Sequence, residues 1–547
     1  MMRPFFKSMS IASLFLLASC KSLLIPEFVI DSYTLSPKKE ALSELEKKQW
    51  RFADPFTDSI PGISLSKAYD FSADKPSNEI IVAVLDSGID LAHEDFEGVL
   101  WVNDDEIPNN GIDDDHNGYI DDIHGYNFLG ESYQEQLENT RILTHKIGDE
   151  TLQNKVKKEV EKALAEAIQN RDRYKGLVIA VNEADKAFKE ASSLAVYSLE
   201  DLEGFETDKI MLKGHISLLK QMLGFAPSVE EVVKELEGAI RYFEDQVAYS
   251  YNVNFDGRAV VGDDPYDLLD VPYGNGNPKN RVEEESHGTH VAGIIGANRE
   301  NNLGSFGIGN RVKLMSIRSV SNADEYDKDI ALGIRYAVDN GAKIINCSFG
   351  KRYSPNKEWV YEALQYAEQH DVLIVHAAGN DSKNIDLFEK NPNYPNDHQG
   401  KDKEYVKNFI SVGAVAPHLD EHLVATFSNI GVQNVDLFAP GDEIYSTFPS
   451  HTYEFESGTS MAAPVVSGVA ALVWSRYPSL KASELKKILM LSGTKINRDV
   501  IDVSSENETL VPFESLSKSG RIINAYQALK LADLVTTKKF KLKHYDQ

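Results

Sequence analysis

The chain of 547 residues is poor in cysteine and in positive charge, and both shortages narrow the class of protein it can be. It has only two cysteines, Cys20 and Cys347. Because Cys20 lies at the end of a targeting segment, we expect no structural disulfide, and we expect Cys347 to be a buried strand thiol. Lys and Arg number 57 against 85 Asp and Glu, which gives a formal net charge of −28. A nucleic-acid partner needs a basic stripe and is therefore excluded, whereas a secreted surface and cation binding are compatible with this charge.

Long hydrophobic runs are also missing. Residues 11–18 form a short apolar stretch behind Arg3 and Lys7, too short for a permanent membrane span. The motif that follows, Leu17-Ala18-Ser19-Cys20, resembles the lipobox of bacterial lipoproteins. The resemblance implies that residues 1–19 are a signal peptide and that acyl chains on Cys20 anchor the exported protein to a membrane. We expect a place in the bacterial cell envelope, on the outer membrane of a Gram-negative cell; the alternative is an ordinary secretory signal with a coincidental cysteine.

Apolar runs alternate with helical patterns through much of the chain. Nearly continuous apolar runs, typical of buried parallel strands, lie at 79–85, 312–317, 343–347, 372–377 and 409–415. Helical patterns at 329–340 and 357–369 separate some of them. Alternation of this kind predicts an α/β fold with a mainly parallel sheet. Ligands of such sheets bind at the carboxyl ends of strands, where Asp86 and the turn at 377–380 are expected.

Residues 132–249 have a different pattern and predict an amphipathic helical insertion. Its apolar residues recur at steps of three and four, with some wider gaps: Val156, Val160, Leu164, Ile168, Leu177, Val181, Phe188 and Ala191. Two further helical patterns follow at 210–223 and 229–249. The insertion is either a lid, partner surface or substrate gate, or a solvated decoration with its own small core; periodicity does not choose between these. The predicted division of the chain is a signal peptide at 1–19, a tether with an entry segment at 20–60, a main α/β domain at 61–131 and 250–530, the insertion at 132–249 and a tail at 531–547.

Three short motifs supply a carboxylate, an imidazole and a hydroxyl, in that order. They are Asp86-Ser87-Gly88, His287-Gly288-Thr289-His290 and Gly458-Thr459-Ser460-Met461-Ala462-Ala463-Pro464. A carboxylate at a strand end can hold an imidazole in one tautomer, and the imidazole can turn a hydroxyl into a nucleophile. Since proline is tolerated in a first helical turn, we expect Ser460 at a helix N-terminus and Pro464 in its first turn. We expect His287 to open a second helix and His290 to be a packed residue within it.

These motifs resemble those of the subtilisin-like serine proteases in order and in local context. The resemblance implies Ser460 as nucleophile, His287 as general base and acid, and Asp86 as the orienting carboxylate. It also implies that Asn380, in Ala377-Ala378-Gly379-Asn380, completes an oxyanion hole with the backbone N–H of Ser460. The implied fold has three layers around a mainly parallel sheet, with the helical insertion as an addition.

The resemblance further implies a serine endopeptidase without an organic cofactor, acting through an acyl-enzyme on Ser460. Its partner would be an extended peptide or protein substrate, bound as an added strand. Ser348, Phe349 and Gly350 match one wall of the family's substrate cleft, and the segment after 312–317 is the candidate for the other. Two alternatives stay open: a catalytically silent binding protein on the same fold, and a peptide ligase or cyclase that resolves the acyl-enzyme with an amine.

An acidic loop at 113–122 resembles a calcium-binding loop. Oxygen donors at alternating positions fit positions 1, 3, 5, 7 and 9 of such a loop: Asp113, Asp115, Asn117, the Tyr119 carbonyl and Asp121. The closing carboxylate is missing because His124 stands at position 12, so an acidic loop without an ion is the alternative. Asp95, together with a loop that begins at Asn301, resembles a second calcium site of the family.

Overall fold

A computed structural model describes residues 35–399 and 403–542. Cys20 and the predicted signal peptide lie outside the described residues. None of the helices in the described part of the chain is long and apolar enough to cross a membrane.

A nine-stranded sheet forms the centre of the molecule. Its strand order is β10-β13-β7-β6-β5-β4-β1-β3-β2, and every pair is parallel except β10-β13. The strands are β1 (Ile80–Asp86), β2 (Gly125–Asn127), β3 (Val312–Arg318), β4 (Ile344–Cys347), β5 (Leu373–Ala377), β6 (Phe409–Val415), β7 (Leu437–Pro440), β10 (Thr494–Lys495) and β13 (Arg521–Ile522). Two hairpins lie outside the sheet: β8 (Ile444–Phe448) with β9 (Thr452–Glu456), and β11 (Asp499–Ile501) with β12 (Leu510–Pro512). All five strands predicted from apolar runs are present in this sheet.

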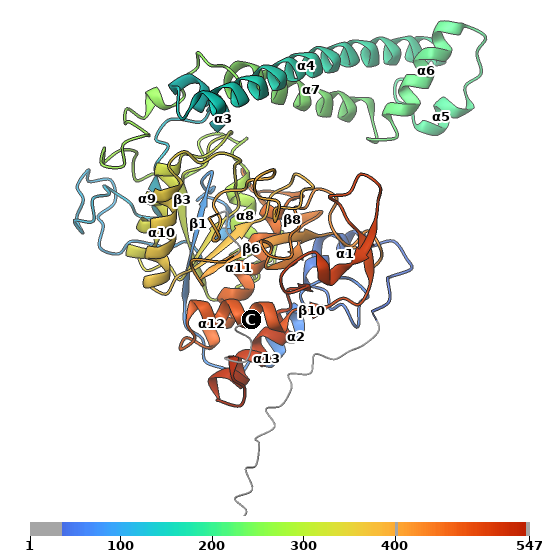
Figure 1. Ribbon diagram of the computed structural model, residues 1–547. Coiled ribbons are helices and arrows are strands. Elements are labelled where there is room, and N and C mark those ends of the chain that lie inside the picture. Colours follow the sequence, from blue (N-terminus) through green and yellow to red (C-terminus); the bar gives the residue numbers. More distant parts are fainter. Residues whose placement is uncertain (1–34, 400–402, 543–547) are drawn as a thin grey trace, which may run out of the picture.

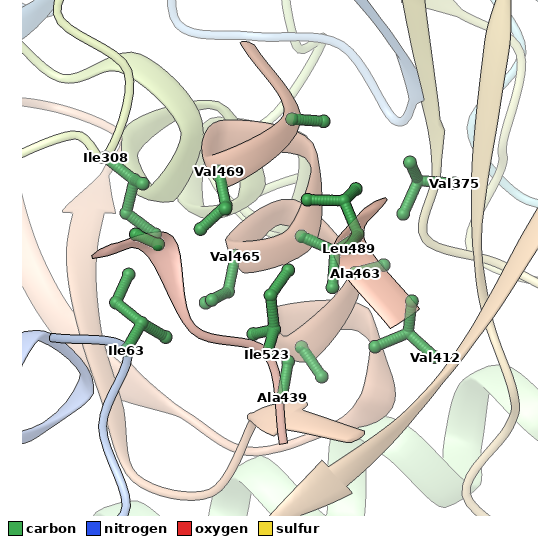
Figure 2. Close-up of a cluster of buried hydrophobic side chains, with 14 of the residues drawn as sticks. Ile63, Ile308, Val375, Val412, Ala439, Ala463, Val465, Val469, Leu489 and Ile523 are labelled. Atoms are coloured by element: carbon green, nitrogen blue, oxygen red, sulfur yellow. The ribbon is translucent and has the colours of Figure 1, made fainter. Parts of the chain in front are cut away.

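Alternate residues of the strands point into two separate cores. Val82 and Val84 of β1 belong to the larger core, whereas Ala83 and Leu85 belong to the smaller one on the opposite face. Figure 2 shows part of the larger core, where Val465 of one helix lies among side chains such as Val412 of β6. The larger core includes side chains from α2 (Leu65–Ser72), α8 (His287–Gly296), α11 (Thr459–Arg476), α12 (Ala482–Ser492) and α13 (Ala525–Thr536). The smaller includes side chains from α9 (Asp327–Asp339) and α10 (Lys357–Gln369). The three-layer α/β prediction is therefore confirmed.

The order of strands places a switch in chain direction at β1. From β1 the chain moves to β2 and then β3 on one side, and it then crosses back to β4 on the other. Crossovers that leave in opposite directions open a crevice at the carboxyl ends of the strands, where ligands bind in sheets of this kind. Asp86 closes β1 at that crevice, and Ser348 follows β4 there.

Most of residues 132–249 form helices that project from the α/β body (Figure 1). They are α3 (Glu138–His145), α4 (Glu150–Ser192), α5 (Leu199–Gly204), α6 (Ile210–Met222) and α7 (Val229–Asp245), followed by the short π-helix η3 (Gln246–Ser250). Helices α4 and α7 lie side by side and form an arm, and α5 and α6 lie at its far end. A separate small core, which includes Val181, Phe188 and Leu219, fills the space between these helices.

Residues near both ends of the described chain pack against the α/β body. Within the predicted tether, Trp50 and Arg51 are buried against the α/β body, next to α1 (Glu44–Gln49). The Trp50 indole donates to the Glu443 carbonyl at 3.1 Å. At the other end, α13 continues through residue 531, and Leu531 is fully buried on its inner face. Apolar side chains decide both cases, because each buries its surface against the main core.

Candidate active site

The Asp86 carboxylate and the His287 imidazole are in direct contact. Nδ1 of His287 lies 2.8 Å from Oδ1 of Asp86, which also accepts from the backbone N–H of Ser87 at 2.7 Å. Asp86 is 1% exposed, so the hydrogen bonds hold it in place without competition from water. The segment after β1 and the start of α8 lie so close together that residue 288 must be glycine. A Cβ there would lie 2.2 Å from the carbonyl oxygen of Gly88.

The pKa of His287 is raised above its ordinary value. Burial of the ring disfavours the charged form, but the charge and the hydrogen bond of Asp86 outweigh burial and favour the imidazolium. An ionised carboxylate can only accept, so Nδ1 carries the proton of the neutral ring and Nε2 remains free as an acceptor. His287 also opens α8, as predicted. His290, one turn later, is fully buried, and burial lowers its pKa to about 3.

Ser460 is the second residue of α11 and is held by Ser348. Its Oγ donates to the Ser348 carbonyl at 3.0 Å, and the Ser348 hydroxyl donates to the Ser460 carbonyl at 2.8 Å. Among the hydrogen bonds of the described residues, none joins Ser460 to His287. The Ser460 hydroxyl must therefore turn away from Ser348 before an imidazole can take its proton.

Pro464 explains why the Ser460 carbonyl is available. The structure places this proline sixth in α11, not in the first turn as predicted. An ordinary residue at 464 would donate its N–H to the carbonyl four residues earlier, that of Ser460, but proline has no N–H. The Ser348 hydroxyl supplies the missing donor. Ser348 is oriented in turn by Asn346, whose Nδ2 donates to Ser348 Oγ at 2.8 Å.

Two N–H donors converge beside Gly458. The Asn380 side chain is fixed by its Oδ1, which accepts from the Thr459 backbone N–H at 2.8 Å and from the Thr459 hydroxyl at 2.9 Å. Its Nδ2 then faces the other way: a Cβ on Gly458 would lie 3.2 Å from Nδ2 and 3.6 Å from the Ser460 N. The space left by the missing side chain is thus bordered by both donors predicted for an oxyanion hole.

A cleft of about 660 Å³ opens from Ser460 and Asn380. Phe349 and Gly350, two of the three predicted substrate-binding residues, line one side of it. Val320 and Ala323, from the segment after β3, also line it, as the sequence suggested. Ser348 touches Ser460 through its backbone and hydroxyl instead. Part of the remaining lining comes from the helical insertion, at residues such as Glu159 and Ala163. Sequence reasoning missed these residues, because no local pattern reports which side chains of a helix face a distant cleft.

The acidic loop brings some of its predicted metal ligands together. Carboxylate oxygens of Glu106, Asp113 and Asp115 lie within 4.8 Å of one another. Glu106 was missed by the sequence reading because it lies outside the alternating run. Asp121 instead accepts from the backbone N–H groups of Asn110 and Gly111, at 3.0 Å each.

The remaining predicted metal ligands of this loop, Asn117 and Tyr119, belong to residues that make other contacts. Asn117 Nδ2 donates to Asp115 at 3.0 Å and to Asp122 at 3.2 Å. The Tyr119 ring packs edge-on against Tyr126, and the Tyr119 backbone N–H donates to Asn117. Burial raises the pKa of Asp122 to about 6, and the nearby Asp115 carboxylate adds a smaller effect in the same direction.

Asp95 does not belong to a cluster of three or more His, Cys, Asp or Glu side chains in the described residues. It is fully buried, and its Oδ1 accepts from Asn301 Nδ2 at 2.6 Å. The two residues named for a second calcium site are therefore neighbours, joined by a hydrogen bond. A further acidic group, which the sequence did not indicate, surrounds Lys486, whose Nζ lies 3.1 Å from Glu404 and 3.2 Å from Asp436.

Comparison with known proteins assigns most of the chain to one family. Residues 77–504 match the family described as Subtilase family, Peptidase_S8. The chain is 37% identical over 232 residues to the cell wall-associated protease of Bacillus subtilis (strain 168), 42% of this chain and 24% of that relative. It is 34% identical over 217 residues to subtilisin DY of Bacillus licheniformis, 39% of this chain and 73% of the relative. It is 32% identical over 266 residues to thermitase of Thermoactinomyces vulgaris, 48% of this chain and 84% of the relative.

Proposed function

The chain belongs to the subtilase family of serine endopeptidases, and on that basis we propose that it hydrolyses peptide bonds within polypeptides through an acyl-enzyme on Ser460. One observation carries the proposal. The Asp86–His287 pair lies at the carboxyl end of β1, and the Ser460 hydroxyl contacts Ser348 at the carboxyl end of the neighbouring strand β4, with two N–H donors beside Gly458.

Each group has one task in the proposed reaction. With the Ser460 hydroxyl turned toward it, Nε2 of His287 takes the proton while Oγ bonds to the scissile carbonyl carbon. Asp86 stabilises the imidazolium that results. The Ser460 N–H and Asn380 Nδ2 donate to the oxyanion. When the C–N bond breaks, His287 returns the proton to the leaving amine, and water then releases the acyl group by the same steps in reverse.

Active-site labelling tests this proposal. A fluorophosphonate probe is expected to label the purified wild-type chain and not the Ser460→Ala variant. A folded wild type that does not label would favour the silent binding protein. Product masses from a peptide substrate with and without an added amine nucleophile separate hydrolysis from ligation: hydrolysis alone gives two fragments whose combined mass exceeds the substrate by one water.

We also propose that Cys20 carries acyl chains that hold the enzyme on the cell envelope. The supporting observation is the lipobox-like sequence before Cys20. Fractionation of cells that express the wild type or Cys20→Ser is expected to place only the wild type in the membrane fraction. Equal recovery of both forms in the membrane fraction would contradict the proposal.

Calcium is the ion proposed for the acidic loop. An all-oxygen set of Glu106, Asp113 and Asp115 suits a hard cation, and a bound cation would relieve the repulsion among these carboxylates. Addition of Ca²⁺ is expected to raise the melting temperature of the Ser460→Ala chain, and a chelator to lower it. Glu106→Gln should lose most of this response, whereas Asp104→Asn, an exposed acid of the same loop, should keep it. Equal responses of the two variants would refute the assignment.

A further inference from the structure

The cleft that contains Ser460 is lined in part by helix α4 of the insertion. Four side chains on one face of α4 border it: Glu159, Lys162, Ala163 and Glu166. Leu137 and Asn139, at the start of α3, also border it. The insertion therefore shares a continuous cleft with the nucleophile.

The chemistry of the proposed reaction indicates which half of a substrate would occupy this cleft. His287 protonates the leaving amine, so the leaving half of the substrate lies toward His287. The acyl half has its carbonyl in the oxyanion hole, beside Asn380. Asn380 and Ser460 line the cleft that reaches α4, whereas His287 and Asp86 do not. The cleft is thus placed to receive the residues on the amino-terminal side of the scissile bond.

Helix α4 is fastened to the wall that follows Gly350. The Tyr353 hydroxyl donates to Oε2 of Glu159 at 2.9 Å. Nζ of Lys155, one turn earlier on α4, lies 5.1 Å from the centre of the Tyr353 ring, within the range of a cation–π contact. Tyr353 comes three residues after Gly350, so α4 and the strand-like substrate wall are held at a fixed spacing.

A buried ionic network fixes α3 to both walls. Lys351 is 2% exposed along its side chain, and its Nζ lies 2.8 Å from Oε2 of Glu138 and 2.8 Å from Oδ1 of Asp327. Arg141 pairs with the same Glu138 oxygen at 2.6 Å and donates to the carbonyl of Asp324. Removing one partner from a buried network of this kind is strongly destabilising. The base of the insertion is therefore a rigid part of the cleft and does not act as a mobile lid.

We propose that the α4 face at residues 159–166 is a substrate-binding surface, which contacts the acyl half of a long, extended polypeptide beyond the residues next to the scissile bond. This proposal rests on the proposed peptidase function and adds its substrate class: extended polypeptide segments are preferred to short peptides. The face carries both charges and is open to solvent. Nζ of Lys162 lies 3.7 Å from Oε1 of Glu166, and these side chains are 77% and 59% exposed. Polar, solvated side chains of this kind suit contact with many sequences.

Two neighbouring alanines of α4 provide a matched test. Ala163 lines the cleft, whereas Ala165 is exposed and does not line it. Ala163→Trp and Ala165→Trp add the same bulk to the same helix, so they share any cost in helix propensity.

One bond that the wild type cleaves in denatured casein is built into two fluorogenic peptides. Both carry the same residues around the bond, one with three residues in its acyl half and one with ten, which extend over about 33 Å.

The wild type is expected to cleave the long peptide with the higher kcat/KM. Ala163→Trp should lower kcat/KM for the long peptide at least fivefold, leave the short peptide within twofold of the wild type, and label with the fluorophosphonate normally. Ala165→Trp should change neither. Equal wild-type kcat/KM for both peptides, an Ala163→Trp variant that cleaves both as the wild type does, or a labelled variant that loses both peptides equally would each overturn this inference. A wild type that cleaves neither casein nor peptides would instead overturn the peptidase proposal on which it rests.

Discussion

The hydrogen bond between Ser348 and the Ser460 carbonyl yields a quantitative prediction. Pro464 removes the helical donor of that carbonyl, and the Ser348 hydroxyl replaces it at 2.8 Å. Ser348→Ala therefore leaves the carbonyl without a donor and also leaves Asn346 Nδ2 without its acceptor. Ser348 is 3% exposed, so water cannot easily take the place of its hydroxyl.

The expected cost follows from these two groups. A buried polar group that loses its partner costs about 1–3 kcal/mol, so the loss of two partners in Ser348→Ala should lower the free energy of unfolding by about 2–6 kcal/mol. In a Pro464→Ala background the N–H of residue 464 can donate to the Ser460 carbonyl. In that background Ser348→Ala leaves only Asn346 Nδ2 without a partner. The loss in the free energy of unfolding that Ser348→Ala causes should therefore be smaller by about 1–3 kcal/mol.

A double-mutant cycle measures this coupling. Guanidinium unfolding is followed by tryptophan fluorescence, since Trp474 is buried on α11 itself. All variants carry Ser460→Ala, which prevents self-digestion and keeps the backbone carbonyl. Ser467→Ala is the control: its hydroxyl donates to Asn346 but not to the carbonyl, so its cost should be the same in both backgrounds. Equal costs of Ser348→Ala with and without Pro464 would refute the reasoning.

Three further predictions concern catalysis and acid stability. Asn380→Leu should lower kcat by about 100- to 1000-fold with little change in KM, a range measured on subtilisin itself for one oxyanion donor; an equal rise in KM would point to a binding role instead. The raised pKa of His287 keeps it protonated, and inactive as a base, to higher pH than an ordinary histidine. Asp86→Asn should therefore move the acid limb of kcat/KM to lower pH while lowering kcat by about 10,000-fold, and an unmoved limb would contradict the pairing. Burial lowers the pKa of His376, a buried residue of β5, to about 4, so the unfolded chain binds the extra proton between there and about pH 6.5. The contribution of His376 to stability should therefore fall by roughly 3 kcal/mol as the pH drops through that window. His376→Phe, in the Ser460→Ala background, should remove that part of the slope in unfolding measurements at pH 7 and pH 4.5; an unchanged slope would exclude His376 as its source.

Long apolar runs and local motifs were the features that sequence reasoning interpreted correctly. The run at 79–85 predicted β1 within one residue, because a strand buried on both faces is apolar throughout. Short elements such as β2 and β13 were not predicted, since two or three residues carry no period. Pro464 was placed one turn too early, because a motif does not state where its helix begins.

For the metal ligands and the segment ends, too, the sequence indicated only a part and the tertiary structure supplied the rest. The alternating acids of the loop at 113–122 were visible in the sequence, but the partner of Asp113 and Asp115 is Glu106, which lies outside the alternation. The predicted tail begins at 531, within α13, and only packing against the main core shows that Leu531 is buried.

The sequence by itself determined the reactive groups, their order and the type of fold, because each depends on residues that are close in the chain. It also determined that residues 132–249 form an amphipathic helical insertion, but not that residues 150–192 are one continuous helix. Tertiary structure alone decided where that helix lies. Contacts such as Tyr353 with Glu159, or Lys351 with Glu138, join residues about two hundred positions apart, and only the path of the chain brings them together. Those contacts place α4 on the cleft of Ser460 and make the insertion a part of the proposed substrate site.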